Sequence, residues 1–309
     1  MITILGAGGA ISNEVVKLLA ARKVPSRLVG RNPVPKPGAS QVVSADLSDK
    51  DQTERAVAGS SVVYLLAGLK YDHKVWAEMW PRIMANTIEA CKRANARLIF
   101  FDNVYMYGRV AGAMTEDTPF NPTSRKGEIR AKIASTLIKE WQSGNLTAMI
   151  ARAADFYGPN AKTGMANVMV FEPMSKKQKA MCLVNDSLAH SYTYTPDAAE
   201  ALMTLAEAES AWNQTWHLPT APNALTAKEF IAQAAEAMGA ALKYRVLHPL
   251  MVRILGWFNP VVGEIHEMLY QNVSPYLFDS SKYAQAFGFK GTPYAEGIRA
   301  TAASYRRAG

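Results

Sequence analysis

The first twelve residues constrain the fold of this chain more than any other segment. A short apolar run, residues 2–5, leads directly into residues 6–12 (Gly-Ala-Gly-Gly-Ala-Ile-Ser), and helical periodicity follows from Asn13. A buried strand that turns through glycines into a helix can bind a pyrophosphate, because backbone N–H groups and the positive end of the helix dipole face the anion. The sequence therefore predicts a dinucleotide-binding loop, and an ordinary glycine turn is the alternative.

The small residues of this loop have separate roles. Gly6 permits the tight turn, and Gly8 and Gly9 let the backbone approach the pyrophosphate. Ser12 replaces the last glycine of the usual pattern and is small enough to pack the helix against the strand. We expect the cofactor contacts of the loop to come from Gly6, Gly8, Gly9, Ala10 and Ile11.

The end of the second predicted strand indicates which nicotinamide dinucleotide is bound. An NAD site usually has Asp or Glu about twenty residues after the loop, where it binds the ribose 2′-hydroxyl. Here residues 29–32 are Val-Gly-Arg-Asn, without a carboxylate. The planar guanidinium of Arg31 can instead bind a 2′-phosphate. We predict NADP as the cofactor, with NAD as the alternative if Arg31 is only a surface cation.

Apolar runs alternate with helical patterns through the first half of the chain. The expected strands are 2–5, 27–29, 41–43, 62–66, 98–101 and 147–150, and the expected helices are 13–22, 51–58, 74–94 and 128–141. This alternation predicts an α/β fold with a doubly wound parallel sheet, a Rossmann domain. Asp46 and Leu47 follow the third strand and can flank the adenine. Ala67 and Gly68 end the fourth, where small residues leave room for the cofactor.

The rhythm changes after residue 151, where loops rich in Gly, Asn and Pro separate shorter elements. We expect residues 1–155 to form the NAD(P)-binding domain. Residues 156–309 are expected to be mainly a substrate-binding region, interleaved with the sheet and without an independent core. Strands are expected at 191–195 and 214–218. Thr226 and Glu229 form a capping-box pattern before a helix at 228–238.

Composition excludes several classes of protein. The net charge is +8, but the densest basic group, residues 175–179, is short and is typical of a solvated loop, so we expect no nucleic-acid partner. Cys91 and Cys182 are too few for a disulfide framework or a metal cage, and the five histidines lack metal-ligand spacing. No signal peptide or membrane span is expected, which favours a cytoplasmic protein with a small-molecule substrate. The sequence leaves open whether the protein forms a homodimer.

Taken in order, these segments resemble the extended short-chain dehydrogenase/reductase family, the NAD-dependent epimerase/dehydratase group of nucleotide-sugar enzymes. The resemblance includes the glycine loop, residues 103–108 (Asn-Val-Tyr-Met-Tyr-Gly), residues 152–159 (Arg-Ala-Ala-Asp-Phe-Tyr-Gly-Pro) and residues 190–199. It implies an NAD(P)-dependent oxidoreductase or epimerase that acts on a carbonyl or hydroxyl of a small metabolite, such as a nucleotide sugar. It also implies a cofactor contact at Ala154.

The departures from the family fall on its catalytic positions. Asn103 stands where members carry Ser or Thr, and Lys126 and Arg130 stand where they carry Tyr and Lys four residues apart. The family's proton relay therefore cannot be carried over. Lys126 and Arg130 share a helix face, so Arg130 can bind ribose hydroxyls, and Lys126 can act as acid or base. The alternative is that both residues only anchor the cofactor.

The sequence leaves two function classes open. The lost Tyr/Lys pair favours a catalytically silent NADP(H)-binding sensor, whereas the elaborate second half favours an enzyme. For the enzyme, the expected catalytic residues are Lys126, Asn103, which can polarise a carbonyl, and Tyr105, which offers a phenol. We further expect residues 154–157, 247–258 and 270–278 to line one pocket over the nicotinamide.

Overall fold

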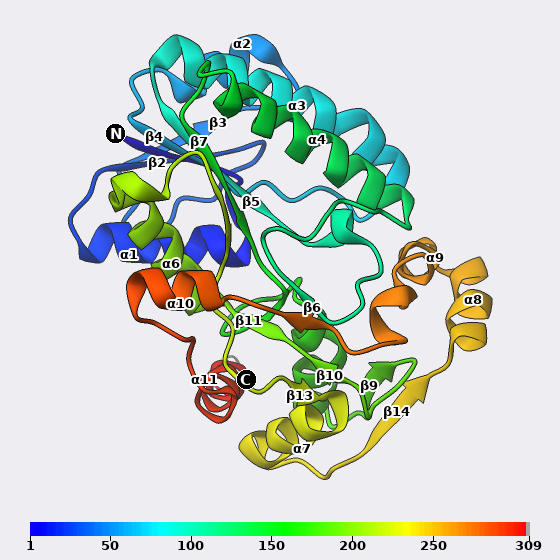
Figure 1. Ribbon diagram of the computed structural model, residues 1–309. Helices are drawn as coiled ribbons and strands as arrows, with labels where there is room; N and C mark the ends of the chain where they lie inside the picture. The colour runs from blue at the N-terminus through cyan, green and yellow to red at the C-terminus, as the bar shows by residue number, and fades with distance from the viewer. Residues whose placement is uncertain (307–309) are drawn as a thin grey trace. The chain divides into compact units, whose positions relative to one another are not determined.

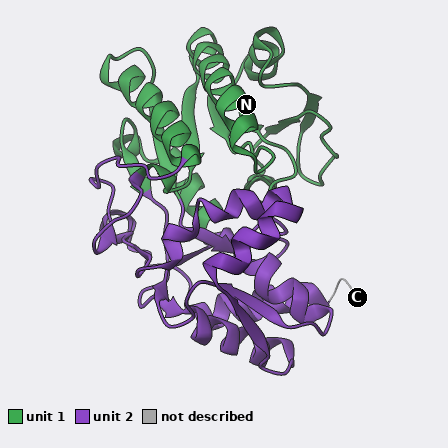
Figure 2. Cartoon of the chain, turned by 90° about the vertical axis from the view of Figure 1, so that its right-hand side faces the viewer, with its two compact units in different colours: residues 1–106, 125–152, 198–216 green, residues 107–124, 153–197, 217–309 purple. Residues whose placement is uncertain are grey.

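The computed structural model describes residues 1–306, and the chain divides into two compact units. Unit 1 comprises residues 1–106, 125–152 and 198–216, and unit 2 comprises residues 107–124, 153–197 and 217–309 (Figure 2). Each unit therefore takes several separate stretches of the sequence.

A seven-stranded sheet forms the centre of unit 1, in the order β12-β7-β5-β4-β1-β2-β3. The strands are β1 (Ile2–Leu5), β2 (Ser26–Gly30), β3 (Gln41–Ser44), β4 (Val62–Leu65), β5 (Arg97–Asp102), β7 (Ala148–Arg152) and β12 (Thr215–His217). The ladders that join β3, β2, β1, β4, β5 and β7 are all parallel. The order reverses between β1 and β4, the position where doubly wound sheets bind their ligands. The predicted fold class is confirmed.

Helices cover both faces of this sheet. On one face lie α2 (Lys50–Val57), α3 (His73–Ala94) and α4 (Arg125–Gln142), and on the other lie α1 (Ala10–Ala21) and α6 (Thr195–Glu207) (Figure 1). The expected helix at 128–141 begins three residues earlier, at Arg125, so Lys126 lies in its first turn. Strands β4 and β7 are buried throughout, as continuous apolar runs between two helical layers must be.

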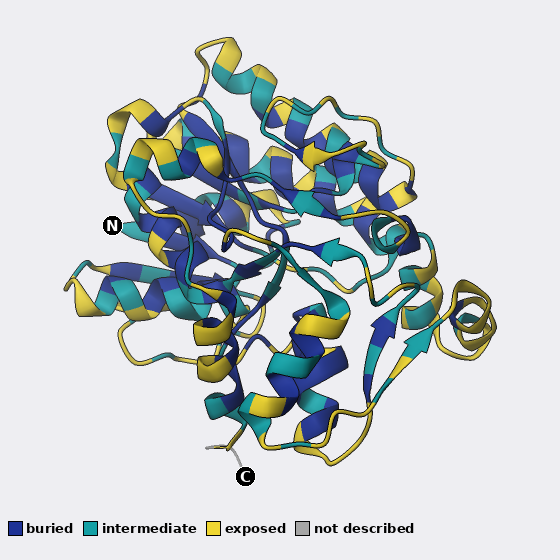
Figure 3. Ribbon diagram, turned by 60° about the horizontal axis from the view of Figure 1, so that its bottom comes forward, coloured by how far each residue is buried: buried dark blue, intermediate teal, exposed yellow. Residues whose placement is uncertain are grey.

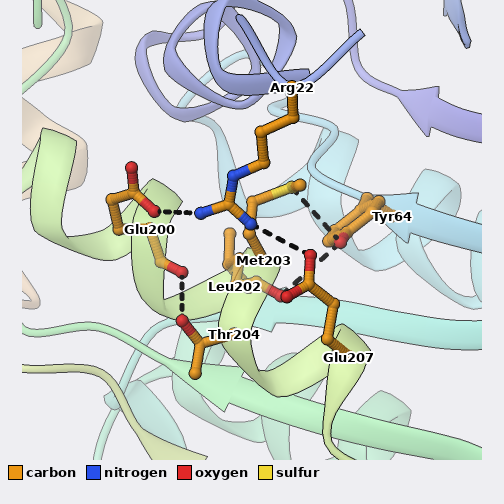
Figure 4. Close-up of polar contacts among 7 residues, drawn as sticks. All are labelled: Arg22, Tyr64, Glu200, Leu202, Met203, Thr204 and Glu207. Carbon is orange, nitrogen blue, oxygen red and sulfur yellow. Dashed lines mark hydrogen bonds and ion pairs between the residues drawn. The ribbon is translucent and has the colours of Figure 1, made fainter. Parts of the chain in front are cut away.

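Polar contacts join α6 to α1 and to β4 within unit 1 (Figure 4). Arg22, at the end of α1, forms ion pairs with Glu200 at 2.6 Å and Glu207 at 2.9 Å. The buried Tyr64 hydroxyl of β4 donates to the carbonyl of Leu202 at 3.5 Å. The ion pairs are exposed, so they contribute little, and most of the stabilisation comes from the buried face of the helix.

Unit 2 is built from short ladders and helices. Its strands are β6 (Ala113–Met114), β8 (Asp155–Tyr157), β9 (Ala180–Leu183), β10 (Ala189–His190), β11 (Tyr192–Tyr194), β13 (Leu225–Thr226), β14 (Tyr244–Leu247) and β15 (Leu277–Phe278). They pair as β8–β11, β9–β14, β10–β13 and β6–β15. Its helices are α5 (Glu172–Ser175), α7 (Ala227–Met238), α8 (Pro249–Phe258), α9 (Pro260–His266), α10 (Ser281–Phe287) and α11 (Tyr294–Arg306). The capping box of Thr226 and Glu229 on α7 is present as predicted.

The expectation that the second half lacks its own core is wrong. Tyr157, Phe171 and Phe230 are almost fully buried in one apolar cluster, together with Ile298 and other residues of α7 and α11. The members come from residues 157 to 302, and they meet because α7 packs on α11. No local periodicity reveals such a cluster, because most of the short elements contribute only a few side chains.

The two late segments expected in the pocket, residues 247–258 and 270–278, differ in burial. Tyr270, Tyr276 and Phe278 are buried, whereas Trp257 and Phe258 at the end of α8 are 73% and 83% exposed. Figure 3 shows that burial alternates with exposure along most helices, whereas several strands are buried along much of their length. Among the described residues, no helix combines the length and apolar character needed to cross a bilayer.

Candidate cofactor and catalytic site

The glycine loop joins β1 to α1 at the switch point of the sheet. Gly6 has a φ of +125°, and a Cβ there would lie 2.6 Å from the backbone nitrogen of Ala67 after β4. Glycine is therefore required by both backbone conformation and close packing. Gly8 also has a positive φ, +87°, but a Cβ there would meet no atom of the described protein within 4 Å. The loop is thus tight at Gly6 and open at Gly8.

The N-terminus of α1 can receive an anion. Its N-cap is Gly9, no side chain of the described range caps the helix, and its first turn carries no acidic residue. Ala10 and Ile11 begin the helix, so their N–H groups are among those that lack an intrahelical acceptor. Ser12 is buried and its hydroxyl donates to the Gly9 carbonyl at 3.0 Å, as suits a small residue that packs in place of glycine. The residues fit a pyrophosphate.

The residues expected around the adenosine end lie on neighbouring strand ends. Arg31, directly after β2, is exposed, and its guanidinium forms no hydrogen bond or ion pair with any other residue in the described range 1–306. Asp46, after β3, accepts hydrogen bonds from the Ser48 backbone at 2.9 Å and the Ser48 hydroxyl at 2.8 Å. These bonds, and more weakly the charge of Arg31, lower the pKa of Asp46. A fixed carboxylate thus lies near an exposed cation.

The other residues expected to contact the adenosine lie after β3 and β4. Leu47 is buried, and its carbonyl accepts from the Asn86 side chain at 3.0 Å, so it is held by α3. Gly68 is exposed, and a Cβ there would meet no described protein atom within 4 Å, whereas the Ala67 backbone contacts Gly6. The space expected beside Ala67 and Gly68 is therefore open at Gly68.

A buried carboxylate binds two arginines at the ends of β5 and β7. One oxygen of Asp102 accepts from both Nε and Nη2 of Arg130, and the other oxygen lies 3.8 Å from Nε of Arg152. All three side chains are almost completely buried. The Arg130 guanidinium also stacks on Trp80 at 4.5 Å and on Phe100 at 4.8 Å. The fork of Arg130 is therefore bound to Asp102, which favours a structural role.

Lys126 lies one turn earlier on α4 and is fully buried. Its ammonium lies 4.5 Å from the ring centre of Tyr71, a cation–π contact that compensates for part of the lost hydration. The Tyr71 hydroxyl is 3.4 Å from the Tyr105 hydroxyl, and the Tyr105 ring is stacked on Trp76. Lys126 therefore belongs to a cluster with two phenols that distant segments of the sequence supply.

Asn103 directly follows Asp102 and is oriented by its neighbours. Its N–H donates to Asp102 at 2.8 Å, and its side-chain oxygen accepts from the Tyr105 N–H at 3.0 Å. The side-chain amide nitrogen of Asn103 can still donate to a carbonyl. Tyr107, by contrast, is buried in unit 2, where its hydroxyl is 2.8 Å from Nε2 of His217. Tyr107 is therefore a packed residue of unit 2 that is bound to His217.

Ala154 and the three segments of the expected pocket belong to unit 2. Ala154 is buried and its N–H donates to the Thr193 hydroxyl at 3.0 Å. Asp155, Gln271 and Asn272 line one pocket, but within the described part of the chain no residue of 247–258 lines it. Most apolar side chains of α8 are exposed, so residues 247–258 differ in this respect from the residues that line the pocket.

Sequence reasoning missed the aromatic ring beside Lys126 and the carboxylate beside Arg130. Asp102 ends an apolar strand, and Tyr71 and Trp76 belong to no motif. The one available signal was the pair of cations at 126 and 130. Two cations that are buried on one helix face require a carboxylate or aromatic rings nearby.

Comparison with known families agrees with this geometry. A model of the NAD dependent epimerase/dehydratase family matches residues 2–217, more than half of the chain. The protein belongs to this family. A comparison with curated protein sequences gives no match.

Solved structures of low sequence identity share the fold. A UDP-glucose 4-epimerase of Thermus thermophilus, in complex with NAD, is 21% identical with a TM-score of 0.82 over 100% of this chain and 99% of that one. A UDP-glucose 4-epimerase of Thermotoga maritima with UDP-glucose is 17% identical with a TM-score of 0.82, and 99% of each chain is covered. A UDP-glucuronic acid 4-epimerase of Bacillus cereus with NAD is 15% identical with a TM-score of 0.80 at the same coverage.

The Asp102 cluster gives a testable stability prediction. Asp102→Asn keeps the shape of the side chain but leaves two buried guanidinium groups without their shared carboxylate, so the free energy of unfolding should fall by about 3–5 kcal/mol. Urea unfolding followed by tryptophan fluorescence measures it, because Trp76 and Trp80 lie beside Arg130.

The control is Glu200→Gln, which makes the same chemical change in the exposed pair with Arg22. It should cost less than about 1 kcal/mol. Equal losses in the two variants would mean that the buried cluster is not a special source of stability.

Proposed function

We propose that this protein is an NADP(H)-dependent oxidoreductase or epimerase that acts on a carbonyl or hydroxyl group of a small metabolite. The observation that carries the proposal is the open glycine loop at Gly8, next to a helix N-terminus that no described side chain caps. Membership of the epimerase/dehydratase family supports it. Unit 1 would bind the dinucleotide, and unit 2 would contact the substrate. The two buried cysteines, both free thiols, suit a cytoplasmic, reducing compartment.

The proposed cofactor contacts follow from the positions of the residues. Arg31 would bind the 2′-phosphate with a guanidinium that has no protein partner among residues 1–306. Lys126, Arg130 and Ala154 remain proposed contacts, with Arg130 limited by its bonds to Asp102. The pyrophosphate would lie on the backbone N–H groups of the loop and helix start, and the adenosine would be bordered by the neighbouring strand ends. The proposed contacts to the pyrophosphate are Gly6, Gly8, Gly9, Ala10 and Ile11. The proposed contacts to the adenosine are Asp46, Leu47, Ala67 and Gly68.

The bound nicotinamide would supply hydride transfer, and the side chains of this chain would manage the proton and the carbonyl. Asn103 would donate its amide N–H to the carbonyl oxygen and polarise it. Lys126 would supply the proton that this oxygen takes up on reduction, or accept it in the reverse direction. The Lys126 ammonium lies 4.5 Å from the centre of the Tyr71 ring. Tyr105, whose hydroxyl lies 3.4 Å from that of Tyr71, would complete the donor cluster.

Cofactor selectivity tests the role of Arg31. NADPH should bind at least about tenfold more tightly than NADH, or about 1.4 kcal/mol, and Arg31→Ala should remove most of this difference. Calorimetry measures both affinities, and Arg55→Ala, another exposed arginine, is the control. Equal affinities in the unmutated protein would refute a 2′-phosphate site.

The loop itself is tested by Gly8→Ala. Its Cβ meets no described protein atom, so the fold should survive, but the methyl group would occupy the space proposed for the pyrophosphate, and affinity should fall at least about tenfold. Gly59→Ala is a matched control, because Gly59 also has a positive φ of +71° and no described atom within 4 Å of a Cβ. Unchanged NADPH affinity in Gly8→Ala would contradict the proposed loop.

The role of Lys126 is tested by Lys126→Met, which keeps an unbranched stem. Turnover of NADPH with a panel of aldehydes, ketones and nucleotide sugars should fall by about a hundredfold or more, the scale of general acid–base catalysis, while NADPH affinity falls only modestly because Lys126 is one of several proposed contacts. Lys132→Met, an exposed lysine on the same helix, should leave turnover unchanged.

The opposite pattern identifies other roles. A loss of affinity with normal turnover at saturating NADPH would make Lys126 an anchor. An absence of hydride transfer across the panel, combined with a protease sensitivity that depends on the redox state of the cofactor, would favour the sensor.

A further inference from the structure

A pocket inside unit 2 has a lining that restricts what it can bind. It lies among β8, the π-helical residues Asn167–Phe171, β9, β10, β11, the start of α7 and residues 271–274. Elements that are far apart in the sequence thus form its wall. All of its lining residues belong to unit 2, so the pocket is defined without reference to unit 1.

One part of the lining is apolar and adaptable, and we call it the methionine wall. It includes Met165, Met169 and Met181 together with Phe230 and Ile231. Phe230 and Ile231 are buried members of the unit 2 core, which makes them a fixed floor. Methionine side chains are flexible and polarisable, so they adapt to an apolar ligand of irregular outline.

Another part of the lining carries hydrogen-bonding groups. The Asp155 carboxylate is 3.0 Å from Nε2 of His190, whose ring lies tilted against the Tyr192 ring with 4.6 Å between centres. The Tyr192 backbone N–H donates to the Tyr294 hydroxyl, and the Tyr192 hydroxyl forms no hydrogen bond within residues 1–306. Gln271 and Asn272 add neutral donors and acceptors. These groups suit hydroxyl or carbonyl groups of a ligand.

The charges of the lining do not suit a phosphate. Its residues include the carboxylate of Asp155 but, within the described chain, no lysine or arginine. The His190–Asp155 pair has a net charge of zero if the imidazole is protonated and −1 if it is neutral, so it supplies no net positive charge in either state. A diphosphate placed here would lose hydration without gaining a cation, which is strongly unfavourable.

The helix that borders the pocket offers no alternative anion site. Ala227, the first residue of α7, lines the pocket, but the capping box already uses the N-terminus of that helix. The Glu229 carboxylate accepts from both the N–H and the hydroxyl of Thr226 at 2.8 Å. The Thr226 hydroxyl and the Glu229 carboxylate therefore already accept backbone N–H groups at this helix start, which a phosphate would otherwise bind.

We propose that this pocket binds an uncharged, amphipathic ligand, whose hydroxyl or carbonyl groups face Asp155, His190 and Tyr192 and whose apolar part lies on the methionine wall. The identification of this ligand with the substrate rests on the function proposed above, whereas the binding site itself does not. The ligand would then differ from the UDP-glucose named for a solved relative, because it carries no diphosphate.

The test compares two probes by titration calorimetry on the full chain without cofactor. Phenyl β-D-glucopyranoside is neutral and has an apolar ring, whereas UDP-glucose carries two phosphates. The phenyl glucoside should bind at least about tenfold more tightly than UDP-glucose, or about 1.4 kcal/mol. Tighter binding of UDP-glucose, or no binding of the phenyl glucoside, would overturn the proposal. Neither result depends on NADP(H) binding, so failure here is distinct from failure of the proposed function.

A charge variant locates the binding. Met181→Lys places a cation in the methionine wall and should weaken the phenyl glucoside at least about tenfold while strengthening UDP-glucose. Met251→Lys makes the same change on the exposed side of α8, outside the pocket, and should alter neither affinity. Circular dichroism checks that both variants fold. An equal response of the two variants would show that the probes bind elsewhere and would overturn the assignment.

Discussion

The buried carboxylate of Asp102 is the interaction that holds together the part of unit 1 where the proposed catalytic residues lie. It ends β5, binds the guanidinium of Arg130 from α4, and lies 3.8 Å from that of Arg152 at the end of β7. Two adjacent strands and a helix are thereby fixed to one point. Removing one partner from such a cluster leaves an uncompensated buried charge, so its members depend on one another.

This cluster also fixes the residues that face the proposed chemistry. The same Asp102 oxygen that binds Arg130 accepts the N–H of Asn103, and the Asn103 side chain in turn accepts the N–H of Tyr105. One turn from Arg130 along α4, Lys126 contacts the ring of Tyr71. Arg130 at the usual lysine position thus supports the geometry, while the neighbouring Lys126 and the two phenols provide the groups that can exchange a proton.

Much of the sheet could be predicted from the sequence, because each strand and helix of the first half has its own local signal. The glycine loop and β4 as a buried strand are such signals, and the capping box of Thr226 and Glu229 is a local signal of the same kind in the second half. The core of unit 2 could not be predicted, because it joins single side chains such as Tyr157, Phe230 and Ile298 from separate elements. Tyr71 was missed for the same reason, since it lies far from Lys126 in the sequence.

The candidate site residues also divide into those with a local sequence signal and those whose role depends on a bound molecule. Gly6 and Ser12 have local roles, and the structure gives each a specific packing partner. Arg31 and Lys126 are proposed to contact the cofactor or the substrate. Local sequence patterns could therefore identify them as candidates but could not show what they contact. The structure adds a guanidinium that no other residue of the described part binds, and a buried ammonium in a cluster with two phenols.

A crystal structure of the protein with NADP(H) tests the central claim most directly. The account predicts the pyrophosphate on the backbone N–H groups of residues 8–11, the 2′-phosphate on Arg31, and the nicotinamide ribose beside Lys126. A dinucleotide bound away from the glycine loop, or a 2′-phosphate that Arg31 does not contact, would contradict it.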